Sequence, residues 1–236
     1  MNSTLHSFAN ASFAPQGAPV LPAIDIEALR EALPIVRRKH VAGHHLYRSG
    51  QPFRAIHLVH AGSYKVSDLA EDGREKVSAF KMRGELLGVE SIGLGAYACD
   101  AVALEDSETW ELPYPAVLKA GATLPGLQEQ IQAALAAEIR RDRSWMLLLG
   151  TLAAEPRVAA FLIDVAARHA RLGYSARHFI LKMSRLDMAS FLALKHETVS
   201  RVLGHLADRH YIDVRRREVR LLDVDGLRSM ACAEAA

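Results

Sequence analysis

Four hydrogen-bonding side chains gather at the start of one expected helix, residues 196–210. Glu197, Ser200 and Arg201 are spaced i, i+3 and i+4, which places them on one helical face, and His196 precedes them. Arginine pairs bidentately with guanine, glutamate accepts from the cytosine amine, and serine suits several bases. One such residue alone is usually ordinary solvated surface. Together, at the start of a helix, they predict contacts to base edges in the major groove of DNA.

The segments on either side would place this helix against a duplex. Residues 184–194 predict a shorter helix with Ser184 as its N-cap, and Leu194-Lys195 makes a tight connection. Residues 211–223 predict two strands around a basic turn, a wing that can reach phosphates. The whole order predicts a winged helix-turn-helix that binds double-stranded DNA. The residues expected at phosphates are Ser184, Arg185, Lys195, Arg215, Arg216 and Arg217.

A long helix is expected over residues 124–150, with a narrow apolar stripe of coiled-coil type. The stripe predicts a seam between two copies of the chain, and hence a homodimer. The alternative is a helix that lies on the core of its own domain. A carboxylate in the seam would be costly to bury unless the arginines beside it offset its charge. The expected interface residues are Leu127, Ile131, Leu135, Ile139, Asp142, Trp145 and Leu149.

The region from about 40 to 115 consists of short β segments separated by turn residues, a pattern typical of an antiparallel roll or sandwich. The Asp72-Gly73 pair predicts a hairpin, because glycine readily adopts a positive φ. The expected strands are 55–62, 63–69, 75–82 and 100–114.

Two further helices are expected, at 24–39, where Pro34 limits the length, and at 155–172, where Gly173 follows as a stop. The fold class is therefore α+β. The expected division is a tail at 1–22, a β-roll at 23–123, a dimerisation helix at 124–150 and a DNA-binding domain at 151–236.

Composition excludes several classes of protein. Half of the 236 residues are hydrophobic and the formal net charge is +2, an ordinary globular balance. No apolar run is long enough to cross a membrane, and the N-terminus lacks the pattern of a secretory signal. Only two cysteines occur, Cys99 and Cys232, which argues against a disulfide framework and favours a cytoplasmic protein. Residues 151–236 hold 14 basic and 10 acidic residues, against 15 and 17 in residues 1–150.

Four blocks of sequence resemble the Crp–Fnr superfamily of bacterial regulators, and specifically its Fnr branch. They are FKMRGELLGVESIG (80–93), EIRRDRSWMLLLG (138–150), residues 179–214 and the closing VRLLDVDGLRSMA. The resemblance implies a β-roll sensor of the cyclic-nucleotide-binding jelly-roll type, a dimerisation helix and a winged helix-turn-helix. It also implies base contacts by Glu197, Ser200 and Arg201, and a TTGAT-like half-site in an inverted repeat. The two recognition helices would then lie about 34 Å apart. His196 departs from the family's commonest residue at that position.

The signal that such a sensor would detect is left open. Iron–sulfur sensors of the Fnr type use N-terminal cysteines, and residues 1–98 contain none, so no cluster is expected. Cyclic-nucleotide binders use a Gly-Glu-Leu segment, present here at 84–86, and later an arginine for the phosphate. Residues 98–101 read Ala-Cys-Asp-Ala instead, so cyclic AMP is not expected, because an unpaired phosphate is costly to bury.

Three alternatives remain at this point. Haem is one, with candidate ligands His40, His44, His45, His57, His60 and Cys99. Cys99 could instead be a redox switch or a buried apolar residue, or the sensor could bind nothing. A metal-dependent cupin-like enzyme is the rival from another class, but neither His44-His45 nor His57-x-x-His60 matches the His-x-His spacing of cupins. We therefore expect no catalysis and no metal. The turn at 71–74 lies where the family contacts RNA polymerase, although an exposed hairpin tip explains it equally.

Overall fold

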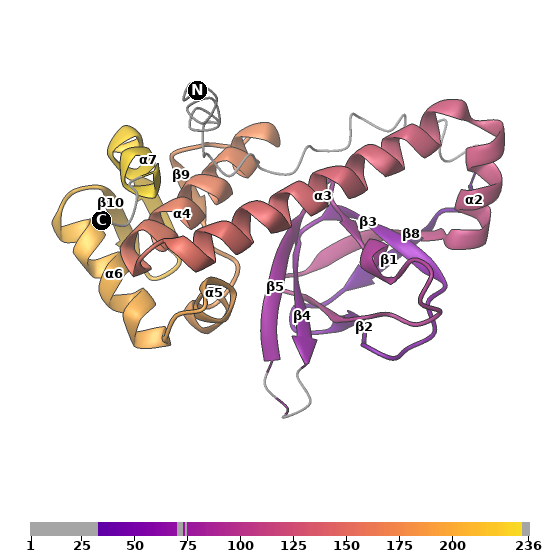
Figure 1. The fold of residues 1–236 in the computed structure, drawn as a ribbon, viewed down its shortest axis with the longest axis horizontal. Coiled ribbons are helices and arrows are strands. Elements are labelled where there is room, and N and C mark those ends of the chain that lie inside the picture. The colour runs from indigo at the N-terminus through magenta and orange to yellow at the C-terminus, as the bar shows by residue number, and fades with distance from the viewer. Residues whose placement is uncertain (1–32, 70–72, 74, 233–236) are drawn as a thin grey trace, which may run out of the picture.

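The computed structural model describes residues 33–69, 73 and 75–232 of the chain. Figure 1 shows two bodies joined by one long helix: a β-roll (β1–β8) on one side and a group of helices with a small sheet on the other. None of the helices described is long and apolar enough to cross a membrane.

The β-roll consists of two antiparallel sheets of four strands each, in the orders β1-β8-β3-β6 and β2-β7-β4-β5. Large apolar side chains such as Ile56, Tyr64 and Leu87 are buried in it. The strand bounds are β1 Val36–His40, β2 His45–Tyr47, β3 Ala55–Ala61, β4 Ser63–Leu69, β5 Glu75–Met82, β6 Leu86–Leu87, β7 Asp100–Ala103 and β8 Ser107–Pro113, with a short 3-10 helix at Val89–Ser91.

The structure confirms most of the expected β segments and corrects two others. Residues 36–39, predicted as the end of a helix at 24–39, lie in the edge strand β1 instead. Here pairing with β8, supported by an Arg38–Glu111 ion pair of 2.9 Å, decides the conformation. Residues 24–32 lie outside the described part of the chain. The expected strand at 100–114 is two strands, β7 and β8. Gly73 has the positive φ predicted for the hairpin turn.

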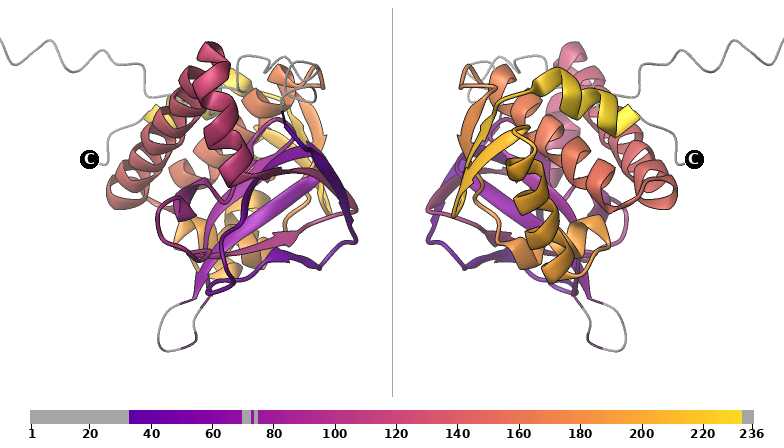
Figure 2. Two further views of the ribbon diagram at one scale, coloured as in Figure 1. Left: turned by 90° about the vertical axis from the view of Figure 1, so that its right-hand side faces the viewer. Right: turned by 90° about the vertical axis from the view of Figure 1, so that its left-hand side faces the viewer.

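Two helices connect the β-roll to the C-terminal domain. α2 (Tyr114–Thr123), which the sequence analysis missed, has a proline in its first turn, where a missing N–H costs nothing. α3 (Pro125–Thr151) confirms the long helix within one residue at each end. The two views of Figure 2 show α3 running along one side of both bodies.

The C-terminal domain has the predicted winged order, with three additional elements that complete its core. The bounds are α4 Ala154–Arg171, β9 His178–Ile180, α5 Arg185–Leu192, α6 His196–Asp208, β10 Ile212–Arg215, β11 Glu218–Leu221 and α7 Val224–Cys232. β9 adds a third strand to the wing hairpin, in the order β10-β11-β9, and Gly173 follows α4 with a φ of 79°. The apolar core of this domain also includes Val77 and Phe80 of β5, so the β-roll contributes directly to it.

Candidate nucleic-acid interface

The first helix of the motif, α5, begins with a complete capping box. Ser184 Oγ accepts a hydrogen bond from the Asp187 N–H at 3.0 Å, and the Asp187 carboxylate accepts from the Ser184 N–H at 2.9 Å. The predicted N-cap is therefore confirmed. At the other end, Ala193 adopts a left-handed conformation with φ 53°, which turns the chain toward α6 within three residues.

The recognition helix α6 has one buried and one open face. Val199, Val202, Leu203 and Leu206 are buried against the domain. On the other face Lys195, His196, Glu197 and Arg201 are exposed and Ser200 is half-buried. Within the described residues, no hydrogen bond or ion pair engages any of these five side chains. The structure thus places the predicted base-reading residues together on one surface, with their polar groups free for an external partner.

The six predicted phosphate contacts fall into three groups. Lys195, Arg215 and Arg216 are exposed, although Arg215 lies 3.7 Å from Asp213. The guanidinium groups of Arg185 and Arg217 donate to backbone carbonyls of the chain itself, those of Arg216 and Lys182. Ser184 is occupied by the cap. Arg216 has a φ of 58° at the tip of the wing, in the turn between β10 and β11. The free cations are therefore on the wing tip and at the start of α6.

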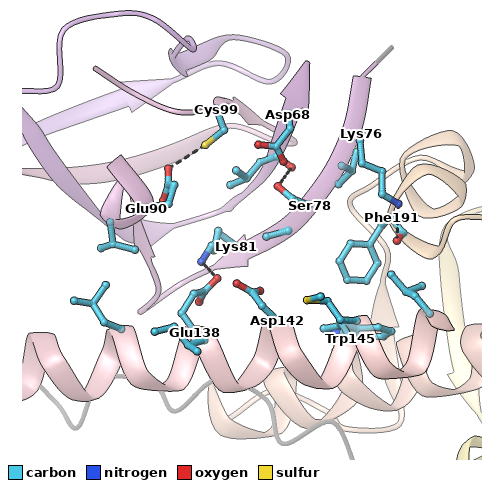
Figure 3. Close-up of a pocket in the computed structure, with 18 residues that line it drawn as sticks. Asp68, Lys76, Ser78, Lys81, Glu90, Cys99, Glu138, Asp142, Trp145 and Phe191 are labelled. Atoms are coloured by element: carbon cyan, nitrogen blue, oxygen red, sulfur yellow. Dashed lines mark hydrogen bonds and ion pairs between the residues drawn. The ribbon is translucent and has the colours of Figure 1, made fainter. Parts of the chain in front are cut away.

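Two lysines of the β-roll hold α5, and the sequence analysis missed both. Lys65 on β4 lies 3.1 Å from Asp187, the capping carboxylate. Lys76 on β5 donates to the carbonyls of Ser190 and Phe191 at the end of α5, where a cation also favours the helix dipole. In Figure 3 the Lys76 side chain points toward Phe191. These partners are more than 110 positions apart in sequence, so no local pattern could have revealed them.

The apolar stripe of α3 is divided between two environments. Leu127 and Trp145 are buried within the chain, against the β-roll core and the C-terminal core respectively. Ile131, Leu135 and Leu149 are half-buried, whereas Ile139 and Asp142 are exposed. Met146 and Leu147 are exposed as well, at 72 % and 45 %. Part of the stripe therefore packs on the core of the same chain, whereas Ile139, Met146 and Leu147 form a second set of apolar side chains that stays exposed.

Comparison with known proteins accounts for this arrangement. The Crp-like helix-turn-helix domain matches residues 156–230, and the cyclic nucleotide-binding domain matches residues 37–123. The chain is 34% identical to the transcriptional regulatory protein btr of Bordetella pertussis, over 91% of this chain and 88% of that protein. It is 34% identical to the transcriptional activator protein anr of Pseudomonas aeruginosa, with the same coverage. The chain belongs to the Crp–Fnr family of transcription regulators. Among solved structures, FixK2 from Bradyrhizobium japonicum superposes with a TM-score of 0.77 at 29% identity, over 86% of this chain and all of that one.

In this Crp–Fnr protein the β-roll, α3 and Phe191 of α5 line an open pocket of about 530 Å³. Figure 3 shows Cys99 and Glu90 on its β-roll side, opposite Glu138 and Asp142 of α3. The thiol of Cys99 donates to Glu90 at 3.0 Å, and the Tyr47 hydroxyl donates to the same carboxylate at 3.2 Å. Burial, and then the negative charge of Glu90, raise the pKa of the Cys99 thiol well above its ordinary value. The thiol is therefore protonated at neutral pH, which does not suit a reactive redox cysteine.

The lining of this pocket is acidic where a cyclic nucleotide would need positive charge. Asp68, Glu90, Glu138 and Asp142 line it, and among the described residues no arginine does. Its two lysines are already engaged, Lys81 by Glu138 of the same pocket and Lys76 by the carbonyls of α5. A phosphodiester here would meet carboxylates without a free cation.

The six haem-ligand candidates do not converge. His57 is buried with its Nε2 3.1 Å from the Tyr97 hydroxyl, whereas His60 on the same strand stacks on Trp110 at 4.5 Å. His45 lies 3.4 Å from Asp100, and Cys99 faces the pocket. Across the described ranges, no group of three or more histidine, cysteine, aspartate or glutamate side chains could hold a metal ion. The described residues therefore offer no clustered ligand set of the cupin kind.

Proposed function

We propose that this Crp–Fnr protein acts as a homodimer that reads a TTGAT-like inverted repeat with two copies of α6, and uses neither an iron–sulfur cluster nor cyclic AMP. The observation that carries the proposal is the open face of α6, where Glu197, Ser200 and Arg201 lie together with no partner among the described residues. Arginine can donate two hydrogen bonds to the guanine of the half-site, and glutamate can accept one from the amine of the cytosine on the opposite strand. Serine can hydrogen-bond to several bases.

The dimer is supported by the open strip of α3. Ile139, Met146 and Leu147 stay exposed on a long helix that packs on its own domain elsewhere. Exposed large apolar side chains on one helix favour association, and a symmetric pair would present two recognition helices to a palindromic site.

The absence of a bound signal is proposed on the chemistry of the sensor. Residues 1–98 contain no cysteine, and the pocket beside the β-roll presents carboxylates and a protonated thiol. RNA polymerase is a proposed partner through the turn at 71–74, of which only Gly73 lies within the described residues.

One experiment tests the central proposal. The purified protein, without added effector, is used to select duplexes from a randomised library, and its mass is measured by sedimentation. An inverted repeat of TTGAT-like half-sites bound by a dimer is the expected result. Enrichment of an unrelated site, or of none, would contradict the proposed reading face. A Soret band on the purified protein, or affinity that appears only with cyclic AMP, would contradict the proposed lack of a signal molecule.

A further inference from the structure

A buried cluster of charges joins the three parts of the molecule. Arg168, on α4 of the DNA-binding domain, lies 2.5 Å from Glu85 of the β-roll and 3.6 Å from Asp164. Asp164 in turn lies 3.2 Å from Arg141 of α3. All four side chains are at most 7% exposed. The cluster therefore connects the sensor, the long helix and the DNA-binding domain at one point.

The central group of the cluster is the Arg168 guanidinium. One of its nitrogens donates both to Glu85 and to the backbone carbonyl of Phe80, at 2.5 and 2.7 Å, and the other approaches Asp164. Glu85 also accepts from the Met82 N–H at 2.9 Å. A planar guanidinium with fixed donors defines orientation as well as distance. Arg168 therefore specifies how α4 is turned relative to β5 and the following loop.

Two carboxylates face two guanidinium groups in this cluster. Burial opposes the charge on Glu85, but the neighbouring cations Arg168, Arg141 and Lys81 hold the pKa of Glu85 below its usual value. Asp164 Oδ1 and the Nε atoms of Arg141 and Arg168 have no hydrogen-bond partner among the described residues. An apolar core of the same shape would leave no such atoms unpaired, and buried ion pairs commonly do not exceed apolar packing in stability. What the charges add is directional contact.

Apolar rings pack beside the cluster. Phe80 of the β-roll packs against Phe161 and Phe191 of the DNA-binding domain, with ring centroids 5.9 and 5.3 Å apart. Trp145 of α3 packs edge-on against Phe191 at 4.8 Å. These rings, and the contacts of Lys65 and Lys76 with α5, also join the two bodies. Arg168 differs from them in that it is buried and holds α4.

We propose that Arg168 is a positioning residue for DNA recognition, which fixes the orientation of the winged helix-turn-helix on the β-roll through Glu85 and Asp164. This proposal rests on the proposed function, a dimer that reads an inverted repeat. It concerns the distance between the two recognition helices of that dimer. A dimer with both domains fixed accepts one spacing between half-sites, since α6 must meet successive major grooves in register. A dimer with loosened domains accepts several spacings.

The test compares Arg168→Lys and the double variant Glu85→Gln/Arg168→Met with the parent protein and with Arg228→Met. Arg228→Met is the matched control, because it removes an exposed arginine of the same domain. Arg168→Lys keeps the charge but cannot bridge three acceptors at fixed angles. The double variant removes one charge of each sign, so no uncompensated charge stays buried. Both variants are expected to unfold within a few degrees of the parent, whereas Arg168→Met alone is expected to lower Tm by about 10 °C.

The decisive measurement is affinity for duplexes that carry the TTGAT-like inverted repeat, with one base pair added to or removed from its centre, and for a single half-site. We expect the parent and Arg228→Met to discriminate against the altered spacings by at least about 10-fold. Arg168→Lys and the double variant should discriminate by less than about 3-fold, with unchanged affinity for a single half-site. If either variant folds and retains the parent's spacing preference, Arg168 is not a positioning residue.

Small-angle scattering of the free proteins gives a second readout that needs no DNA. The radius of gyration should increase in both variants and stay constant in Arg228→Met. Failure of the parent to bind any duplex would contradict the proposed function alone, because the scattering result still decides whether Arg168 fixes the domains. An unchanged radius of gyration in both variants would overturn the positioning role.

Discussion

The open face of α6 and the buried junction beneath α4 use the same residue types for opposite purposes. On α6, Glu197 and Arg201 are neighbours on one face with no partner in the described part of the chain. At the junction, Glu85 and Arg168 satisfy each other at 2.5 Å, with little exposure to water. Unpaired charged side chains at a surface are available to a ligand, whereas ion pairs in the interior define geometry. If both proposals hold, recognition and orientation depend on separate sets of charges.

The largest expected effect is the loss of the dimer, because reading an inverted repeat requires two copies of the open face of α6. Ile139→Asp places a charge in the exposed apolar strip of α3, where the side chain is 53% exposed in the single chain. We expect monomers on sedimentation, a nearly unchanged Tm, and at least about 100-fold weaker binding to the inverted repeat. Leu118→Asp, at a similarly exposed leucine on α2, should remain dimeric. A dimeric Ile139→Asp protein would show that α3 is not the seam.

Arg201→Ala sharpens the comparison at the open face. Its guanidinium is free in the structure, so its loss should leave folding unchanged and cost roughly 1–3 kcal/mol of binding free energy. The effect should concentrate at one guanine, so preference at that base pair should relax. Competition binding with each single-base variant of the site measures this. Site preference that survives the substitution would rule out Arg201 as a base reader.

A contact in this molecule can be predicted from sequence when the residues that form it lie close together along the chain. The α6 face could be predicted because Glu197, Ser200 and Arg201 lie within five positions and helical spacing alone brings them together. The Arg168–Glu85 contact joins residues 83 positions apart, and neither segment contains a pattern that indicates the other. β1 was mistaken for helix because its residues are mostly exposed, and only pairing with β8 makes it a strand.

A third test concerns a polar group inside the β-roll. Burial, the main cause, lowers the pKa of His57 from 6.5 to about 4, and its Nε2 lies 3.1 Å from the Tyr97 hydroxyl. Between pH 6.5 and 4 the unfolded chain binds a proton that the folded chain does not, so stability falls as the pH decreases through this window. At pH 5 the loss is about 2 kcal/mol.

His57→Gln should remove this acid sensitivity while keeping a hydrogen-bonding group near Tyr97. Urea denaturation of the parent and the variant at pH 7.5 and pH 5 measures the difference. His60→Gln is the control, since His60 stacks half-exposed on Trp110. Equal pH dependence in the parent and in His57→Gln would show that this interior group is not held neutral by burial.

The smallest expected effect comes from Arg216, whose substitution distinguishes a phosphate contact from a base contact on the same open surface. Arg216 lies at the tip of the wing, exposed, with a φ of 58°. Removing a phosphate contact weakens binding to all sequences equally and lowers the salt dependence by about 1 in the log–log slope for each subunit. Arg216→Ala should therefore bind every duplex a few-fold more weakly, and Arg216→Lys should restore the slope because it retains the charge. A change in base preference would mean that the wing also reads sequence, and the open face would then extend beyond α6.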